Sequence, residues 1–466
     1  METRPSVAHD EADRPRSASI RGPAEPGHGG PLEPGSPRGT LAVLVLVLVS
    51  TVNAIDRQLP FILVDPIKAE LGLSDTQVGL MAGLAFAVVY SFAGLPLARL
   101  ADRGSPRRVL VASLAIWSLA TAVTGGAQNF IQLILCRIGV AASEAGSMPA
   151  AHALIARTFP TSRRAAIVAA FSLGVPIGST LGLALGGWIN DVANWRSAFF
   201  IVGLPGLLIA AGAMIVLPPL RQRASAIHPD TPSFPQSIRR LLAFRSFRHL
   251  AAASSLFACG SYGLNVFAPA FLIRTHNLST AAAGVGVGLA FGIGGGIGTF
   301  AGGLLGDRLG RRNAAWRAGV PAMGQFLCIP LALSAWLVDD ATLSIVLLGT
   351  VYLCGLLYFA PTFAAIQYLV PDSGRAMASA VLLFCLTLVG SSIGPMAIGW
   401  ASDRLAPIYG QMSLRYAMCL MAVTMFWSGV HFMLAARALA KDINRAQGRC
   451  QSSANQSPLD GARLQN

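Results

Sequence analysis

The stretch Gly303-Leu-Leu-Gly-Asp307-Arg308-Leu-Gly310-Arg311-Arg312 ends one long apolar run and precedes another. A looser copy, Leu97-Ala-Arg-Leu-Ala-Asp102-Arg103-Gly-Ser-Pro-Arg107-Arg108, lies about half a chain earlier in the same setting. Each copy places an Asp-Arg pair and further arginines between two uncharged runs. A basic turn that recurs between apolar runs is typical of a duplicated polytopic membrane protein.

The composition supports this interpretation. Of the 466 residues, 53% are hydrophobic and 12% are charged, about half the charged fraction of a soluble domain. Most of the charge-free runs reach the ~20 residues that cross a bilayer as a helix. They cover residues 41–55, 78–98, 109–136, 165–190, 197–220, 249–273, 277–306, 318–338, 341–371, 376–402 and 416–436.

Two details complete the count of spans. The first run reaches crossing length only by continuing through Asp56-Arg57 to Val64. The run 138–156 is interrupted only by Glu144, and with Asn129–Arg137 it makes one more span. Because lipid offers the backbone no hydrogen-bond partners, such runs must be helical. We therefore expect an all-α polytopic membrane protein with about twelve transmembrane helices.

A net charge of +14 could indicate a nucleic-acid-binding protein, but the placement of the charges argues against it. Arginines gather after alternate spans, at Arg99, Arg103, Arg107, Arg108, Arg157, Arg163, Arg164, Arg221, Arg223, Arg239, Arg240, Arg245, Arg248, Arg308, Arg311, Arg312 and Arg317. The opposite loops carry few. This positive-inside pattern predicts a multi-pass protein of the bacterial inner membrane with both termini in the cytoplasm. No basic stripe with interleaved aromatic residues suggests nucleic acid.

The apolar runs fall into two groups of six. The order of features repeats: Phe159-Pro160 corresponds to Val370-Pro371, and Asn194-Trp195-Arg196 corresponds to Leu414-Arg415-Tyr416. We expect a disordered cytoplasmic N-tail, an N-terminal six-helix half, a proline-rich cytoplasmic linker, a C-terminal six-helix half and a cytoplasmic C-tail. Their bounds are 1–39, 40–218, 219–248, 249–438 and 439–466.

Four charges lie well inside predicted spans, at Asp56, Arg57, Arg137 and Glu144. An embedded charge costs at least a few kcal/mol, so it normally marks a pathway or a paired site. Helix geometry places Asp56 and Arg137 at similar depths, and Glu144 about 10 Å deeper on the face of Arg137.

Two interpretations of these charges remain open. In a proton relay, Asp56 and Glu144 carry protons, and Arg57 and Arg137 tune them because arginine cannot release its proton. In a static network, the charges merely hold spans 1 and 4 together. We favour the relay.

The two Asp-Arg loops resemble the loop signature of the major facilitator superfamily. Several segments of the first half resemble bacterial members of the spinster branch of this superfamily. They are Asn53–Gln58, Leu63–Leu80, Gly94–Arg103 and Arg137–His152, together with Trp195, Arg196 and Phe199. That likeness covers roughly residues 50–220, whereas the second half matches mainly at superfamily level. The sequence departs from the branch at Ala141 and Ser143, where glycines are usual before the glutamate.

The resemblance implies twelve helices in two six-helix halves, proton-linked transport and a central cavity for amphipathic, lipid-like molecules. It assigns the coupling positions to Asp56, Arg57, Arg137 and Glu144. It also implies latches that close the cytoplasmic side, in which Asp102 acts against span 11 and Asp307 against span 5. The latch residues are Asp102, Arg103, Asp307, Arg308, Arg311 and Arg312. In the alternative interpretation, these loops only set the topology.

Glycines recur every four residues in span 5 (Gly174 to Gly186) and in span 8 (Gly284 to Gly296). Such rows let helix backbones approach closely. They fit either ordinary tight packing or a sliding interface between the halves, and we favour the interface. Weaker candidates for a substrate cavity are polar residues within or beside the spans, each equally suited to a helix–helix hydrogen bond. They are Asn53, Tyr262, Asn265, Gln325 and Tyr358.

We therefore expect a proton-coupled secondary transporter that exports an amphipathic or lipid-like organic molecule, working as a monomer within the lipid bilayer. An alternative is an organic-anion importer in which Arg57 and Arg137 bind a carboxylate. A charge-paired arginine would favour export, and a free one import. A third alternative is a non-transporting membrane sensor. The sequence has no phosphate loop, nucleophile elbow or metal cluster, so we expect no enzymatic activity, metal or cofactor.

Overall fold

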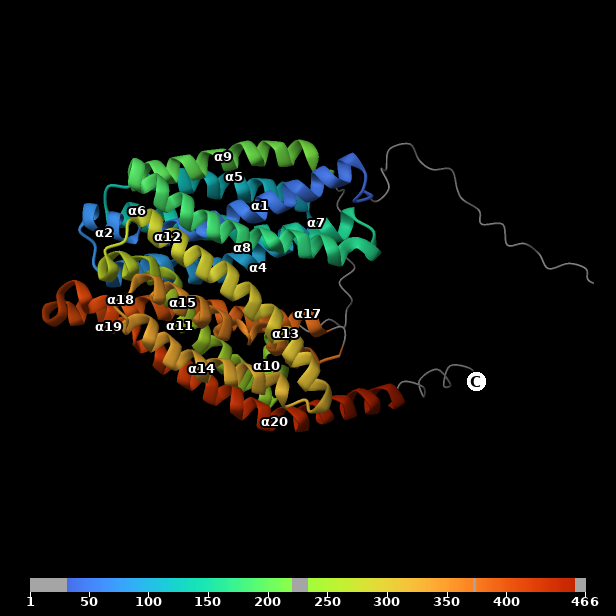
Figure 1. The fold of residues 1–466 in the computed structure, drawn as a ribbon. Helices are drawn as coiled ribbons and strands as arrows, with labels where there is room; N and C mark the ends of the chain where they lie inside the picture. Colours follow the sequence, from blue (N-terminus) through green and yellow to red (C-terminus); the bar gives the residue numbers. More distant parts are fainter. Residues whose placement is uncertain (1–31, 220–233, 372–373, 457–466) are drawn as a thin grey trace, which may run out of the picture.

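The computed structural model describes residues 32–219, 234–371 and 374–456, and every regular element in these ranges is a helix (Figure 1). Eleven stretches are long and apolar enough to cross a membrane. The last of them, Met377–Gln447, contains two helices that reverse direction at Gly410, whose φ is +54°. These ranges therefore hold twelve spans, which confirms the predicted polytopic all-α fold.

The N-terminal half contains spans 1 to 6, several of which are interrupted helices. In order they are α1 (Pro37–Ile62); α3 (Asp75–Gly79), η1 (Leu80–Ala85) and α4 (Phe86–Arg103); α5 (Pro106–Thr124); α6 (Phe130–Glu144) and α7 (Ser147–Thr158); α8 (Thr161–Val192); and α9 (Trp195–Val216). The short helix α2 (Val64–Leu71) connects spans 1 and 2, and η1 is a π-helical turn within span 2.

The C-terminal half contains spans 7 to 12. In order they are α11 (Arg245–His276); α12 (Thr280–Leu289), η2 (Ala290–Gly294) and α13 (Gly295–Arg312); α14 (Trp316–Leu337); α15 (Ala341–Leu356) and α16 (Phe359–Gln367); α17 (Arg375–Cys385), η4 (Leu386–Ser391) and α18 (Ser392–Tyr409); and α19 (Ser413–Met418) with α20 (Leu420–Gln456). The 3₁₀ turn η5 (Gly410–Met412) joins spans 11 and 12.

The expected linker and tails contain more helix than predicted. The linker range 219–248 holds α10 (Phe234–Leu242) and the first turn of α11, while residues 220–233 lie outside the described residues. Pro235 is tolerated because it lies at the start of α10. At the other end, α20 continues through Gln456, well into the expected tail. The expected N-tail lies mostly outside the described residues, and α1 begins at Pro37.

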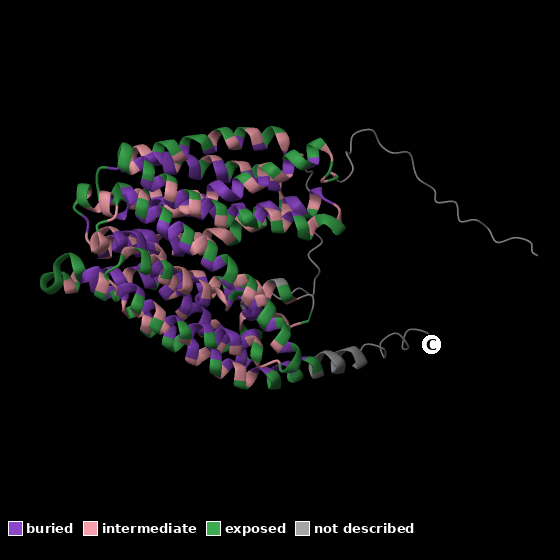
Figure 2. Cartoon of the chain, in the orientation of Figure 1, coloured by how far each residue is buried: buried purple, intermediate pink, exposed green. Residues whose placement is uncertain are grey.

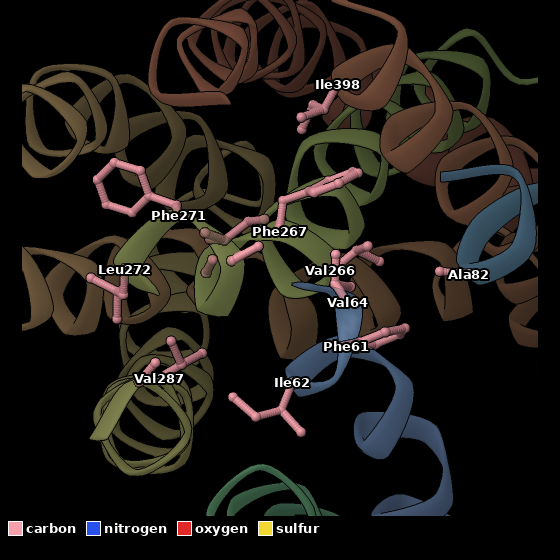
Figure 3. Close-up of a cluster of buried hydrophobic side chains, with 14 of the residues drawn as sticks. Phe61, Ile62, Val64, Ala82, Val266, Phe267, Phe271, Leu272, Val287 and Ile398 are labelled. Carbon is pink, nitrogen blue, oxygen red and sulfur yellow. The ribbon is translucent and has the colours of Figure 1, made fainter. Parts of the chain in front are cut away.

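The hydrophobic core shows where the two halves meet. One cluster draws buried side chains from both halves, including Ile62 of span 1, Phe267 of span 7 and Ile398 of span 11 (Figure 3). Two further clusters each belong to a single half. The shared cluster lies toward the end of the molecule that holds α2 and α19, and the halves separate toward the end where α20 finishes (Figure 1).

Large apolar side chains are exposed on the outside of the bundle. Leu208 is 76% exposed, Ile215 84% and Phe300 70%, and Figure 2 shows exposed residues along α9. In water such a surface would favour aggregation, whereas lipid tails cover it without cost. The chain is accordingly a multi-pass membrane protein.

Spans 4 and 10 are both broken, which the run lengths alone did not indicate. Span 4 breaks after Glu144, and span 10 breaks after Leu356. Proline has no N–H and clashes with the carbonyl four residues before it. Pro149 lies four residues after the break at Ala145, and Pro361 lies four residues after the break at Leu357. The two halves therefore share this feature of their fourth helix.

The glycine rows have two different roles. A Cβ atom on Gly284 of span 8 would lie 2.2 Å from the Leu183 carbonyl oxygen of span 5, so this row does line the interface between the halves. The row in span 5 instead packs inside its own half: a Cβ atom on Gly178 would lie 2.2 Å from the carbonyl oxygen of Thr51 in span 1. For span 5, therefore, the tight-packing interpretation holds and the interface interpretation is wrong.

Candidate functional site

The four embedded charges come together between spans 1 and 4. Asp56, Arg137 and Glu144 are all at most 3% exposed. Arg57 forms an ion pair with Glu144 through its Nε and Oε1 atoms, and its side chain keeps 29% of its surface exposed. Two carboxylates and two guanidinium groups give the cluster no net formal charge, which lowers the cost of burying them.

Both carboxylates retain oxygens without hydrogen-bond partners. Neither oxygen of Asp56 accepts a hydrogen bond from the described residues, and Oε2 of Glu144 is also buried without a partner. The side chains of Glu144, Arg137 and Trp117 lie near Asp56. Burial removes water from these oxygens, and the described side chains replace only part of its hydrogen bonds.

Aromatic rings of span 2 hold both arginines in place. The Arg57 guanidinium lies 4.6 Å from the ring centre of Tyr90 and 5.4 Å from that of Phe86. Arg137 lies 5.0 Å from the ring centre of Phe86. Cation–π attraction therefore joins span 2 to the charge cluster. The sequence motifs did not indicate this role for Phe86 or Tyr90.

Glu144 lies at the break in span 4. It is the last residue of α6, and the hydroxyl of Ser143 just before it donates to the Gly139 carbonyl at 2.7 Å. The predicted spacing of two helical turns between Arg137 and Glu144 brings both into the buried face. Arg57 reaches Glu144 from span 1, so the ion pair joins spans 1 and 4.

The weaker cavity candidates have mixed positions. Gln325 is fully buried and donates to the Gly355 carbonyl at 3.2 Å, so it connects spans 9 and 10. Tyr358 is 4% exposed and packs against Phe257 with ring centres 4.5 Å apart. Both therefore serve packing within the C-terminal half.

The other three candidates are partly buried. Asn265 accepts a hydrogen bond from the Tyr352 hydroxyl at 2.9 Å. Tyr262 belongs to the C-terminal half and lies near Arg57 of the N-terminal half. Asn53 lies in α1, one turn before Arg57. Tyr262 and Asn53 are thus the candidates nearest the charge cluster.

The expected inner latches are open. All six of their residues are exposed, namely Asp102, Arg103, Asp307, Arg308, Arg311 and Arg312. Neither aspartate side chain makes an ion pair or hydrogen bond with the described residues, although the Asp102 carbonyl accepts one from Arg157 at 2.6 Å. The conformation is therefore one in which the halves are apart at this end.

At the opposite end, a polar cluster joins the halves. The charge pattern of the sequence predicts that this end faces outward, and we call the cluster the outer closure. Arg274 of span 7 pairs with Asp65 at 2.5 Å and with Asp75 at 2.8 Å. Lys68 also pairs with Asp75, at 2.6 Å. Burial raises the pKa of the Asp65 carboxyl, and Arg274 opposes that shift. Because desolvation offsets much of the attraction, such a cluster orients the two halves more than it stabilises them.

Two aspartates complete the outer closure by capping helices of the opposite half. The Asp403 carboxylate, in span 11, accepts from the N–H groups of Asp75 and Thr76 at the start of span 2, at 2.9 and 2.8 Å. The Asp191 carboxylate, in span 5, accepts from the Ala281 N–H at the start of span 8, at 2.8 Å. A carboxylate at a helix N-terminus satisfies unpaired N–H groups and the helix dipole.

A sequence signal for these caps exists, but the motif analysis did not use it. Gly187 precedes Asp191 by four residues, as Gly399 precedes Asp403 and Gly303 precedes Asp307. A Cβ atom on Gly187 would lie 2.4 Å from the Thr280 carbonyl oxygen, and one on Gly399 would lie 2.1 Å from that of Asp75. The glycine allows the close approach that lets the aspartate reach the facing helix.

The Trp195-Arg196 motif has a structural role at the same end. Trp195 Nε1 donates to Glu70 at 2.5 Å, and Arg196 donates to Glu70 at 2.8 Å and to the Ala127 carbonyl at 2.6 Å. The hydrogen bonds from Arg196 and Trp195 hold the pKa of the exposed Glu70 below its ordinary value. The motif therefore fixes α2 and the turn between spans 3 and 4 to the start of α9.

Comparison with known proteins shows which family shares this architecture. Residues 46–395 match the Major Facilitator Superfamily. A protein of Mycolicibacterium smegmatis described as an MFS-type efflux pump is 37% identical over 410 residues, which cover 88% of this chain and 95% of the relative. Protein spinster homolog 1 of Mus musculus is 26% identical over 451 residues, which cover 90% of this chain and 84% of the relative.

A solved structure has the same fold. It is the crystal structure of a bacterial homolog to the human lysosomal transporter Spinster, in an inward-facing and unoccupied conformation. It matches with a TM-score of 0.79 at 27% identity and covers 88% of this chain and 99% of that chain. The resemblance to the spinster branch noted from the sequence is thus confirmed, and these relatives are transporters rather than enzymes.

Proposed function

Because this chain belongs to the Major Facilitator Superfamily and is therefore a membrane transporter, we propose that it exports an amphipathic or lipid-like organic molecule in exchange for protons. The supporting observation is the buried cluster of Asp56, Arg57, Arg137 and Glu144, with its ion pair and its unpartnered carboxylate oxygens. A proton on Glu144 would weaken its attraction to Arg57. Protonation can thereby change how span 1 is held against span 4.

The pairing of the arginines favours this proposal over the organic-anion importer. Arg57 is paired with Glu144, and Arg137 lies in the field of both Asp56 and Glu144. An anionic substrate would therefore have to compete with two buried carboxylates for either guanidinium. The description of the mycobacterial relative as an efflux pump supports export.

In the proposed alternating-access cycle, the two ends of the molecule open and close in turn. The positive-inside pattern predicts that both termini lie in the cytoplasm, and in that orientation the conformation described here is closed outside and open inside. Outward opening then requires the caps from Asp191 and Asp403 to separate. In the same step, Asp102 and Asp307 would cap the inner ends of spans 11 and 5 and close the cytoplasmic side.

The proposal is tested with purified protein in liposomes that contain a pH-sensitive dye. Lysophospholipids, sphingoid bases, cationic drugs and small carboxylates are added in turn under an imposed pH gradient. We expect proton flux with an amphipathic class and none with the carboxylates. Proton flux with the carboxylates alone would support the importer. If no class of compound produced flux but one of them raised the thermal stability of the protein, the result would support a sensor.

The contact between spans 5 and 8 provides a prediction about conformation. In Gly284→Leu, the side chain would meet the Leu183 backbone, so we expect the outer end to open. Gly296→Leu is the matched control, because a Cβ atom at Gly296 meets nothing within 4 Å. The opening is measured with a cysteine introduced at the buried Thr280 and an impermeant maleimide. The rate of labelling should rise at least about tenfold in Gly284→Leu, because the overlap with the Leu183 backbone destabilises the closed conformation by more than about 1.4 kcal/mol. It should not rise in Gly296→Leu, and equal labelling of both variants would contradict the closure.

A further inference from the structure

Seven cationic side chains lie on the last turn of α10, the start of α11 and the C-terminal part of α20, and we call this surface the α10–α20 basic face. All seven are exposed. They are Arg239, Arg240, Arg245, Arg248, Arg437, Lys441 and Arg445. Nothing in the proposed transport cycle uses them.

The helix α10 is built like a helix that lies in a membrane interface. Its inner face is apolar, with Leu241 2% exposed in a core cluster that also contains Phe244 and Ile443. Its outer face combines Arg239 and Arg240 with Leu242, which is 45% exposed. Arginine beside an exposed leucine is the pattern by which a helix contacts both phosphates and acyl chains.

The neighbouring helix ends bring the remaining cations to the same surface. Asp442 of α20 accepts hydrogen bonds from the Ser246 N–H at 2.8 Å and the Ser246 hydroxyl at 2.7 Å, which ties the end of span 12 to the start of span 7. Within the described residues of α10, α11 and α20, Asp442 is the acidic residue near this surface, and it is 7% exposed. Its charge is therefore turned inward and does not neutralise the face.

The length of α20 places its cations beyond the hydrocarbon region. It has 37 residues, or about 55 Å of helix, against about 30 Å for the hydrocarbon core. Lys441 and Arg445 therefore extend to the depth of the lipid head groups.

Three arginines at the same end of the N-terminal half are instead bound to backbone carbonyls. Arg107 donates to the Leu217 carbonyl at 3.1 Å, Arg157 to the Asp102 carbonyl and Arg164 to the Phe159 carbonyl at 3.0 Å. They stabilise helix ends. In the part of the chain that the structure describes, none of the seven cations of the basic face makes a side-chain hydrogen bond or ion pair, so all seven are available to an external anion.

We propose that the α10–α20 basic face binds the head groups of anionic phospholipids in the leaflet on this side of the membrane. Its cations supply the phosphate contacts, and Leu242 contacts the acyl region. The inference rests on the membrane-spanning fold and the charge pattern alone, so it stands or falls independently of the transported substrate.

The test compares Arg239→Gln/Arg240→Gln and Lys441→Gln/Arg445→Gln with the wild type. Purified proteins are mixed with phosphatidylglycerol or phosphatidylcholine in detergent, and bound lipid is counted by native mass spectrometry. We expect the wild type to prefer phosphatidylglycerol, and its affinity to fall about fivefold for each cation removed. The preference should vanish at high salt, because phosphate contacts are screened.

Arg99→Gln/Arg108→Gln is the matched control, since it removes two exposed arginines at the same end of the other half. It should retain the preference. An equal loss in this control would reduce the effect to overall charge and overturn the proposal, as would a wild type without any preference. If a variant fails to fold, salt titration of the wild type still tests the proposal. Inorganic phosphate should not displace bound phosphatidylglycerol if the head group is held as part of a lipid.

Discussion

Glu144→Gln is expected to abolish substrate-driven proton flux in liposomes while leaving the protein folded. Glutamine keeps the size of the side chain but has no titratable proton, so the loss should be complete rather than graded. The dye assay measures the flux directly. Exchange of labelled for unlabelled substrate across the membrane needs no net proton transfer, and we expect it to persist in this variant.

Glu70→Gln is the matched control for this prediction. Glu70 also pairs with an arginine, at 2.8 Å, but it lies outside the four-charge cluster and is exposed. Its flux should equal that of the wild type. If Glu144→Gln instead lost exchange together with thermal stability, the four charges would be a static network. Unchanged proton flux would remove Glu144 from the coupling mechanism altogether.

The double variant Asp191→Ala/Asp403→Ala is expected to open the outer end. Each alanine removes a cap that satisfies N–H groups of the opposite half, and loss of a cap costs about 1 kcal/mol. Together they should shift the balance between the two conformations by at least about tenfold. Spin labels on α2 and α19 measure the distance between the outer ends, and a second, longer distance should become populated.

Asp339→Ala tests whether any lost carboxylate would have this effect. Asp339 pairs with Arg415 at 2.9 Å, but both residues belong to the C-terminal half. The distance between the outer ends should therefore stay as in the wild type. An unchanged distance in the double variant would show that the Arg274 ion pairs and the apolar contacts of the shared core cluster suffice to keep the outer end closed.

Much of the fold could be predicted from the sequence because the membrane restricts the choices. Lipid forces long apolar runs into helices, so twelve spans and the division into halves followed from charge-free runs and repeated loops. The breaks in spans 4 and 10 were not predicted. Their cause, a proline four residues later, is local, but many prolines in membrane helices produce only a kink.

The candidate site was predicted in part. The cost of burying charge made Asp56, Arg57, Arg137 and Glu144 conspicuous in the sequence. The support from Phe86 and Tyr90 was not, since aromatic residues are common in membrane spans and carry no distinctive spacing. The outer closure was missed for another reason: a glycine four residues before an aspartate marks Asp403 as a possible cap, but which helix it caps is decided only when the two halves pack and Asp403 meets Thr76.

The sequence by itself determined that the chain crosses the membrane, how often it does so, and which charges it buries, because each of these depends on the free energy of moving individual groups into lipid. Only the tertiary structure decided that Arg57 rather than Arg137 forms the ion pair with Glu144, that the span-5 glycines face span 1, and that the outer rather than the inner aspartates are engaged. Those outcomes depend on how two rigid halves meet, and pairing between distant segments is fixed by packing geometry rather than by the properties of any one segment.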